Sequence, residues 1–206
     1  MLAALWDKAV RVLGGRPGTA GDLAARYGEP HRGYHNADHV LAVVRDVELL
    51  AAHRSLADQA VLVLAALAHD VVYDGQPGDD ERASAAWAVE RLTEAGLNAD
   101  PVTDRVAALV LATIDHEAGD ELTALLMDAD LAILGSDAQG YERYRQAVRR
   151  EYAHVPDEAW RAGRAQVLRG LLARDPLYAT PQARDRWEAR AKANLAAELA
   201  SLSDPR

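Results

Sequence analysis

His69 and Asp70 stand next to each other directly after an apolar run over residues 60–68. A run of this length predicts a buried helix, so both side chains are expected where that helix ends. Neutral imidazoles and ionised carboxylates together favour a divalent transition ion, whereas carboxylates alone favour magnesium or calcium. The pair therefore predicts part of a metal centre and needs further ligands from elsewhere in the chain.

Two other segments supply candidate ligands. His35 and His39 are four positions apart, and Asp128 and Asp130 close a second apolar run. The two histidines share one face of a helix that begins at or before His35, but a helix capped by Asn36 would leave His35 in the preceding turn. The two aspartates lie about 200° apart around a helix, so at most one of them points well at the same ion. A carboxylate buried in this apolar run must be ligated, paired or protonated.

Residues near these segments are candidates for proton transfer or substrate binding. Glu81 lies in an acidic stretch typical of a helix start, and it could also carry a proton into the site. Arg32 could hold a phosphate through two hydrogen bonds or lie on the solvated surface. His116 is either a contact to a second metal or substrate, or a histidine at a helix end. Tyr73 belongs to the loop around residues 73–80, which we expect to shape the substrate pocket.

The elements that must position these residues are predicted to be helices throughout. Alanine and leucine dominate the chain, and apolar residues recur every three or four positions, which favours an all-α fold without a sheet. The expected helices span residues 2–13, 19–28, 36–53, 56–70, 80–96, 101–115, 120–134, 138–153, 157–174 and 181–201.

Composition limits the classes of function. With 206 residues, 50% of them hydrophobic, residues 1–206 are expected to form a single domain. The net charge of -9 argues against nucleic-acid polymers and anionic membranes as partners, although a small phosphorylated ligand at a local cation remains compatible with it. The absence of cysteine excludes disulfides, zinc–thiolate sites and thiol nucleophiles. Without a signal-peptide core or a membrane span, we expect a cytoplasmic protein, and a homodimer is left open.

The ordered set of His39, the pair His69–Asp70, and Asp130 resembles the H...HD...D signature of the HD-domain metal-dependent phosphohydrolase superfamily. Further segments resemble a bacterial subfamily of predicted HD phosphohydrolases, and the likeness spans nearly the whole chain. These segments are Arg26–Pro30, Tyr34–Asn36, His69–Asp74, Asp80–Ala85, Asp128–Gly135, Arg149–Tyr152 and Arg190–Leu195.

The resemblance implies a single-domain HD fold, an all-helical bundle with a metal site at its centre. The implied metal ligands are His39, His69, Asp70 and Asp130. The superfamily's last ligand is typically an aspartate followed by a hydrophobic or basic residue and a short turn of helix, which selects Asp130 and leaves Asp128 as a supporting or second-metal candidate. In the cyclic-nucleotide phosphodiesterase branch, a similar Tyr-His-Asn segment supplies the histidine that protonates the leaving oxygen, which implies this catalytic role for His35.

Together these features predict a metal-dependent hydrolase of a small phosphate ester or a nucleotide, acting through a metal-activated water. The expected cofactor is a divalent ion, Mn, Fe, Ni, Co, Zn or Mg, with about two coordination positions open to water and substrate. Asp70 could bridge to a second ion or accept the proton of the water, and His35 or Glu81 could protonate the leaving oxygen. The alternatives are a diiron oxygenase of the HD fold, which needs more histidines than His116, and a non-catalytic nucleotide-binding module.

Overall fold

The computed structural model describes residues 1–97, 101–115 and 119–203, and the regular secondary structure within these ranges is entirely helical. Contacts between residues divide the chain into two compact units, Met1–Asp130 and Leu131–Arg206. The predicted all-α fold is confirmed, whereas the single domain stays a prediction. None of the described helices is long and apolar enough to cross a membrane.

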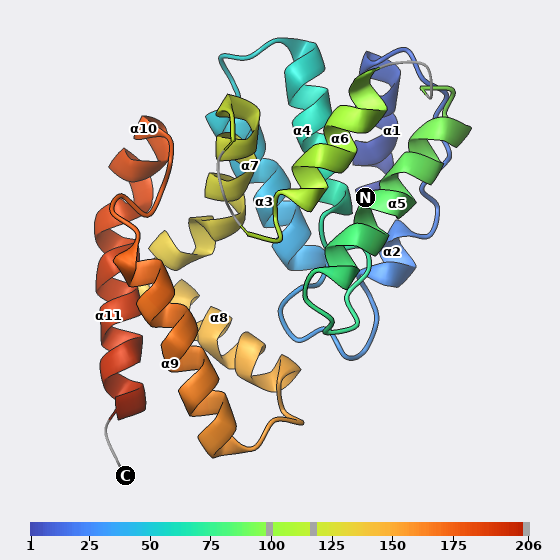
Figure 1. Cartoon of the computed structure of the whole chain (residues 1–206). Coiled ribbons are helices and arrows are strands. Elements are labelled where there is room, and N and C mark those ends of the chain that lie inside the picture. Colours follow the sequence, from blue (N-terminus) through green and yellow to red (C-terminus); the bar gives the residue numbers. More distant parts are fainter. Residues whose placement is uncertain (98–100, 116–118, 204–206) are drawn as a thin grey trace. The chain divides into compact units, whose positions relative to one another are not determined.

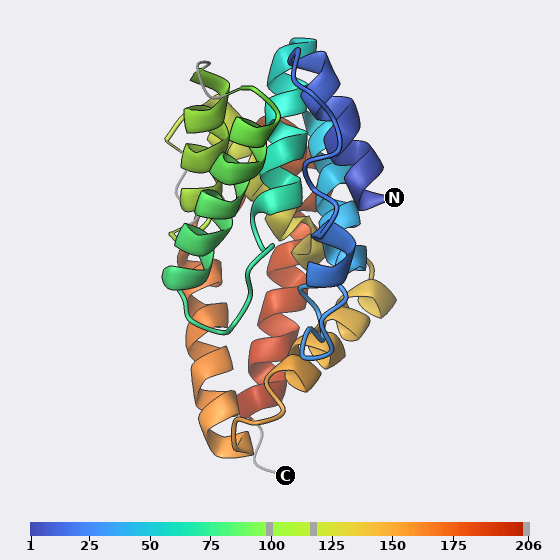
Figure 2. The ribbon, with the colours of Figure 1, turned by 90° about the vertical axis from the view of Figure 1, so that its right-hand side faces the viewer.

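The first unit is organised around one buried helix, α4 (Figures 1 and 2). Its helices are α1 (Leu2–Val12), α2 (Leu23–Arg26), α3 (Ala37–Leu50), α4 (Leu56–Ala68), α5 (Asp79–Glu94), α6 (Pro101–Leu111) and α7 (Glu121–Asp130). Every residue from 60 to 68 is buried, and α4 packs against α1, α3, α5, α6 and α7. A helix that is apolar on all sides has to lie inside such a shell, because no side of it can face water without exposing hydrocarbon.

Helix ends in this unit are fixed by side-chain caps. Asn36 caps α3, since its side-chain oxygen accepts hydrogen bonds from the amides of Asp38 at 2.9 Å and His39 at 3.4 Å. Ser55 caps α4 in the same way by accepting from the amide of Asp58 at 3.0 Å. The cap at Asn36 decides between the two alternatives for the first histidine pair: His39 lies in the first turn of α3, and His35 lies before the helix.

The second unit consists of the 3-10 helix η1 (Leu131–Gly135), α8 (Ala138–Glu151), α9 (Asp157–Ala173), α10 (Pro181–Ala183), the π-helical segment η2 (Arg184–Glu188) and α11 (Ala189–Ser203). Its interior contains a charged group. Glu198 on α11 is 4% exposed, and it accepts hydrogen bonds from Arg164 on α9 at 2.9 and 3.0 Å and from the Tyr141 hydroxyl on α8 at 2.6 Å. This carboxylate therefore ties three helices of the unit together.

Most expected helices are observed with ends shifted by up to four residues, and three differ by more than such a shift. The helix expected over residues 19–28 is reduced to the single turn α2, because glycines and prolines flank it on both sides and disfavour helix extension. The helix expected over 120–134 ends at Asp130 and continues as the tighter η1. The helix expected over 181–201 is divided into α10, η2 and α11, where the backbone of Gly135 approaches so closely that a Cβ there would lie 2.4 Å from Cβ of Trp187.

Charge is unevenly distributed between the two units. Acidic residues outnumber basic ones more than twofold within Met1–Asp130, whereas basic residues are slightly more numerous within Leu131–Arg206. The overall negative charge of the chain is therefore a property of its first unit.

Candidate metal centre

The first two candidate ligands come from helices that pack against each other in the first unit. His39 is placed by the first turn of α3, while His69 is the C-cap residue that directly follows α4. The ring nitrogen Nδ1 of His69 lies 2.8 Å from the backbone oxygen of Ala66, a contact in which the nitrogen must donate. This hydrogen bond fixes the ring so that Nε2 faces away from the backbone of α4, the arrangement typical of a metal-binding histidine.

The four predicted ligands meet in space. The Nε2 atoms of His39 and His69 are 3.3 Å apart. Oδ2 of Asp70 lies 3.0 Å from Nε2 of His69 and 3.4 Å from Nε2 of His39. Oδ1 of Asp130, the last residue of α7, lies 3.3 Å from Nε2 of His39 and 3.4 Å from Nε2 of His69. Three segments that are far apart in the sequence thus bring two carboxylates next to the same pair of histidine nitrogens.

These separations fit the coordination shell of a divalent ion. Nitrogen and oxygen ligands about 2.0 to 2.2 Å from one tetrahedral or octahedral ion lie about 2.8 to 3.6 Å from each other. The observed ligand-atom separations of 3.0 to 3.4 Å fall within this range. Two imidazoles with two carboxylates also form the mixed donor set that suits a transition ion. The residues present therefore fit a divalent ion, and His39, His69 and Asp70 form a candidate metal cluster by geometry alone.

Burial differs within the cluster. The side chains of His39 and His69 are 3% and 2% exposed, whereas those of Asp70 and Asp130 are 17% and 14% exposed. The histidines thus form the closed side of the cluster, and solvent reaches it from the carboxylates.

The cluster favours positive charge on its nitrogens. Burial by itself lowers the pKa of His39, but hydrogen bonds to Asp130 and Asp70 more than offset this, and the pKa is raised. Burial is the largest single effect on His69 and lowers its pKa, but the charge of Asp70 and the hydrogen bonds to Asp130 and Asp70 together outweigh burial and bring that pKa well above its usual value. Burial would raise the pKa of Asp70, yet the neighbouring His69 and His39 hold that pKa well below its ordinary range. The two carboxylates thus favour a positive charge at this position, which a bound cation would supply.

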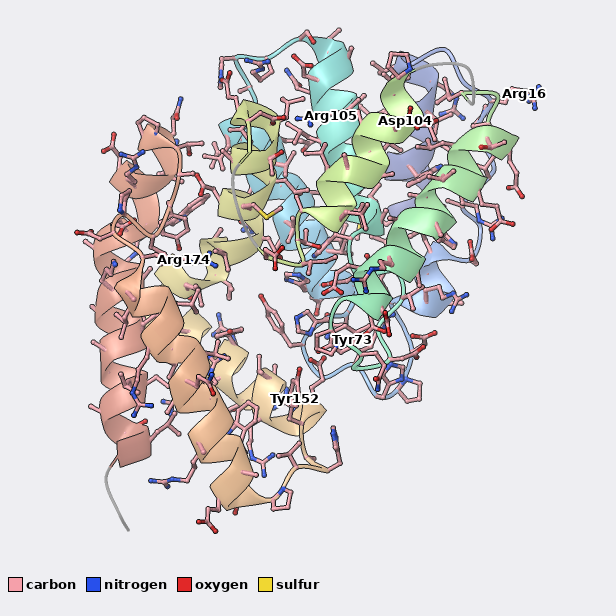
Figure 3. All side chains as sticks on the ribbon, viewed as in Figure 1. Arg16, Tyr73, Asp104, Arg105, Tyr152 and Arg174 are labelled. Atoms are coloured by element: carbon pink, nitrogen blue, oxygen red, sulfur yellow. The ribbon has the colours of Figure 1, made fainter. Side chains whose placement is uncertain are left out.

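An aromatic group borders the cluster. The ring of Tyr73, on the loop between α4 and α5 (Figure 3), is stacked on the ring of His35, with centroids 4.4 Å apart and an angle of 25° between the planes. The ring of Tyr34 lies 4.7 Å from that of His39, and the ring of His35 lies 5.5 Å from that of His39. His35 is therefore held beside the ligands by ring contacts.

The loop that carries Tyr73 is fastened by the first turns of α5. The carboxylate of Asp80 accepts from the amide of Asp74 at 3.1 Å and from that of Gln76 at 2.8 Å. Ser84 accepts from the amide of Val72 at 3.0 Å. Sequence reasoning did not single out Asp80 and Ser84, because an acid and a serine near a helix start are common and their partners are visible only in three dimensions.

Two of the predicted site residues form hydrogen bonds with neighbouring groups of the protein. The Arg32 guanidinium is buried and donates to three backbone oxygens and to Glu29, so in the structure its donors are engaged by the protein itself. Glu81 accepts a hydrogen bond from the amide of Gly78 at 2.6 Å and so caps α5, which leaves His35 as the proposed proton donor. Gly78 enters this cap with a φ of +86°, a conformation that glycine adopts without strain.

Two further predicted residues are not part of the cluster as described. Asp128 is buried in α7, and the carboxylate of this helix that approaches both histidines is that of Asp130. His116 lies outside the described residues. The catalytic, substrate-binding and metal-binding roles assigned from the sequence stay predictions.

The family of the chain follows from its match to a family model. The model of the HD domain matches residues 36–153, more than half of the chain and a range that includes all four clustered ligands. The chain therefore belongs to the HD domain family, whose members are generally metal-dependent phosphohydrolases that bind divalent ions. Comparisons with curated proteins and with solved structures gave no match. The predicted superfamily is confirmed, while the bacterial subfamily stays a prediction.

Proposed function

We propose that this chain hydrolyses a small phosphate ester or a nucleotide with the help of a divalent ion held by His39, His69, Asp70 and Asp130. The observation that carries the proposal is that the two imidazole nitrogens lie 3.3 Å apart and that a carboxylate oxygen of Asp70 and one of Asp130 each lie 3.0 to 3.4 Å from both nitrogens. Membership of the HD domain family supports the same reaction class. When bound, the ion would supply a Lewis acid that lowers the pKa of a water and offsets charge on a phosphoryl oxygen.

The protein's own groups account for the remaining chemistry. Hydrolysis forms a bond between a water oxygen and phosphorus and breaks the bond between phosphorus and the leaving oxygen. The leaving oxygen needs a proton, and we assign its donation to His35, whose ring lies beside the ligand cluster. The attacking water gives up a proton to solvent. A pKa of Asp70 well below its usual range supports a role as an ionised ligand rather than as the acceptor of that proton.

The first test is turnover by protein loaded separately with Mn²⁺, Fe²⁺, Co²⁺, Ni²⁺, Zn²⁺ or Mg²⁺. The panel contains p-nitrophenyl phosphate, bis(p-nitrophenyl) phosphate and the common nucleotides. We expect metal-dependent release of phosphate or of the leaving group by the wild type, and its loss in His69→Ala and Asp70→Ala together with the bound metal. His35→Ala should keep its metal while turnover falls by about 10² or more.

The matched control for these substitutions is His53→Ala. His53 is an exposed histidine that lies 3.3 Å from Glu121, and we expect its removal to leave both metal content and turnover unchanged. Equal turnover by the wild type, His69→Ala and Asp70→Ala would contradict the proposal. Two irons per chain with oxygen consumption would instead identify an oxygenase, and thermal stabilisation by nucleotides without turnover would identify a binding module.

A further inference from the structure

Arg32 lies between α2 and α3, and its side chain is completely shielded from solvent. A buried guanidinium requires partners for its charge and its hydrogen-bond donors, since desolvation of an unpaired charge is very costly. Its Nε donates to Oε2 of Glu29 at 3.0 Å, which supplies the opposite charge. The other end of the guanidinium faces the backbone of the candidate metal centre.

Three hydrogen bonds of Arg32 connect two separate parts of that centre. Nη1 donates to the backbone oxygen of His35 at 2.9 Å and to that of Asp70 at 2.7 Å. Nη2 donates to the backbone oxygen of Val71 at 3.1 Å. One rigid, planar group therefore holds the turn that carries the proposed proton donor against the helix end that carries a proposed metal ligand.

Arg32 also restrains His35 through an aromatic ring. The central carbon of its guanidinium lies 5.6 Å from the centre of the Tyr73 ring, and that ring is stacked on His35. The same guanidinium carbon lies 5.2 Å from the centre of the Tyr27 ring. The hydroxyl of Tyr27 donates to the backbone oxygen of Leu67 near the end of α4. The contacts thus reach His35 both through its backbone oxygen and through the ring stacked on it.

We propose that Arg32 is a positioning residue that fixes the His35 ring relative to Asp70 for protonation of the leaving oxygen. The inference rests on the proposed function, because it presumes that His35 is the proton donor. Arg32 acts through these neighbours and touches no substrate, since its side chain is fully buried. Lysine would keep the positive charge beside Glu29, but its single ammonium lacks the planar set of donors that reaches three carbonyls at once.

The test compares two leaving groups in Arg32→Lys. A p-nitrophenolate leaves without a proton, whereas an alkoxide needs one, so misplacement of His35 should affect only the second. The probes are p-nitrophenyl phosphate and glycerol phosphate, or the p-nitrophenyl and methyl esters of thymidine monophosphate if the wild type is a diesterase. At saturating Mn²⁺ we expect kcat for the alkyl ester to fall by about 10² and that for the p-nitrophenyl ester by less than about tenfold.

The matched control is Arg26→Lys. Arg26 also approaches Glu29, at 3.8 Å, but its side chain is 43% exposed. We expect Arg26→Lys to leave kcat unchanged for both the alkyl ester and the p-nitrophenyl ester. An equal loss on both esters in Arg32→Lys would overturn the inference, because a purely structural defect does not distinguish leaving groups. If Arg32→Lys fails to fold, Tyr73→Leu removes the ring stacked on His35 and must give the same selective loss.

A readout independent of turnover separates this inference from the proposed function. In the Mn²⁺-free protein, proton nuclear Overhauser contacts between the rings of His35 and Tyr73 are expected for the wild type and for Arg26→Lys. They should weaken or vanish in Arg32→Lys while the melting curve stays cooperative. Contacts that persist unchanged in Arg32→Lys would overturn the positioning role. A wild type inactive on every ester would end the proposed function, and the ring contacts would still decide whether Arg32 orients His35.

Discussion

At the scale of single residues, the cluster separates ligands that are shielded from ligands that face solvent. The two histidines are almost completely buried, whereas Asp70 and Asp130 keep a partly exposed side chain. Removal of a buried histidine therefore leaves a hole in the core as well as an incomplete site. Substitution of a carboxylate by its amide is the cleaner test of ligand identity, because the shape of the side chain is kept and its charge is lost.

The choice between Asp130 and Asp128 can be decided in this way. Asp130→Asn should weaken Mn²⁺ or Zn²⁺ binding by more than about 10²-fold, since Oδ1 of Asp130 lies next to both histidine nitrogens. Asp128→Asn should cost no more than the about 10- to 100-fold that is typical of groups outside the coordination shell. Calorimetric titration of the two variants measures both constants. A larger loss in Asp128→Asn than in Asp130→Asn would reverse the assignment.

At the scale of the elements, the cluster is made by helix ends rather than by helix faces. The start of α3, the end of α4 and the end of α7 supply its ligands. The adjacent His69 and Asp70 directly follow α4, and both side chains approach the nitrogen of His39.

The cap of α3 should consequently matter more to activity than to stability. Asn36→Ala and Ser55→Ala each remove an N-cap, and each should lower the free energy of unfolding by about 1 kcal/mol. Only Asn36→Ala should also lower turnover, because Asn36 lies between His35 and the helix that carries His39. Chemical denaturation and kcat measured on both variants make the comparison. Equal activity of the two variants would show that the cap does not position His35.

The helices could be predicted because they depend on local patterns, whereas the ligand set came from the resemblance to the HD-domain superfamily and stays a prediction. The apolar run over residues 60–68 identifies a buried helix, and Asn36 is a favoured cap residue, so both features follow from residue type and spacing. The roles of Arg32 and Glu81 could not be predicted, since their partners are a set of backbone carbonyls and a single amide that only the folded chain brings within reach. The break at Asp130 and the π-helical segment likewise depend on packing, as at Gly135 and Trp187.

At the scale of the whole molecule, each unit has its own source of ionic stabilisation. In Leu131–Arg206 it is the buried group around Glu198. Burial would raise the pKa of Glu198, but the hydrogen bonds and charge of Arg164 outweigh burial and lower that pKa. A lowered pKa in the folded state means that the stabilisation is complete above the pKa of the unfolded chain and is lost as the pH falls through the folded value.

Glu198→Gln should therefore have a pH-dependent effect. At neutral pH it leaves Arg164 buried without its counterion, and the free energy of unfolding should fall by about 3 to 5 kcal/mol. The difference in the free energy of unfolding between Glu198→Gln and the wild type should shrink as the pH drops below the ordinary glutamate pKa of 4.5. Urea denaturation across this pH range measures it. The control is Glu142→Gln, which removes an exposed ion pair with Arg145 and should change the free energy of unfolding little. A loss of unfolding free energy in Glu198→Gln that stays constant with pH would contradict the prediction.

A bound ion should stabilise Met1–Asp130 because its ligands lie on three separate helices of that unit. At a free ion concentration 100 times the dissociation constant, the gain is about 2.7 kcal/mol, or an increase in Tm of roughly 5 to 11 °C. Calorimetry of metal-loaded protein before and after EDTA measures the shift. His69→Ala should show no metal-dependent shift in Tm. A shift in that variant equal to that of the wild type would mean that the stabilising ion binds elsewhere.

The excess of acidic residues in Met1–Asp130 also has a kinetic consequence. Within a Debye length of about 8 Å at physiological salt, such a surface concentrates dications and repels phosphates. An anionic substrate that approaches the metal-free carboxylates meets a repulsive potential. Once a dication is bound there, the local potential becomes attractive for the anion. We therefore expect ordered addition, with the cation binding before the anion, and we expect added salt to slow both associations because it screens the attraction in each step.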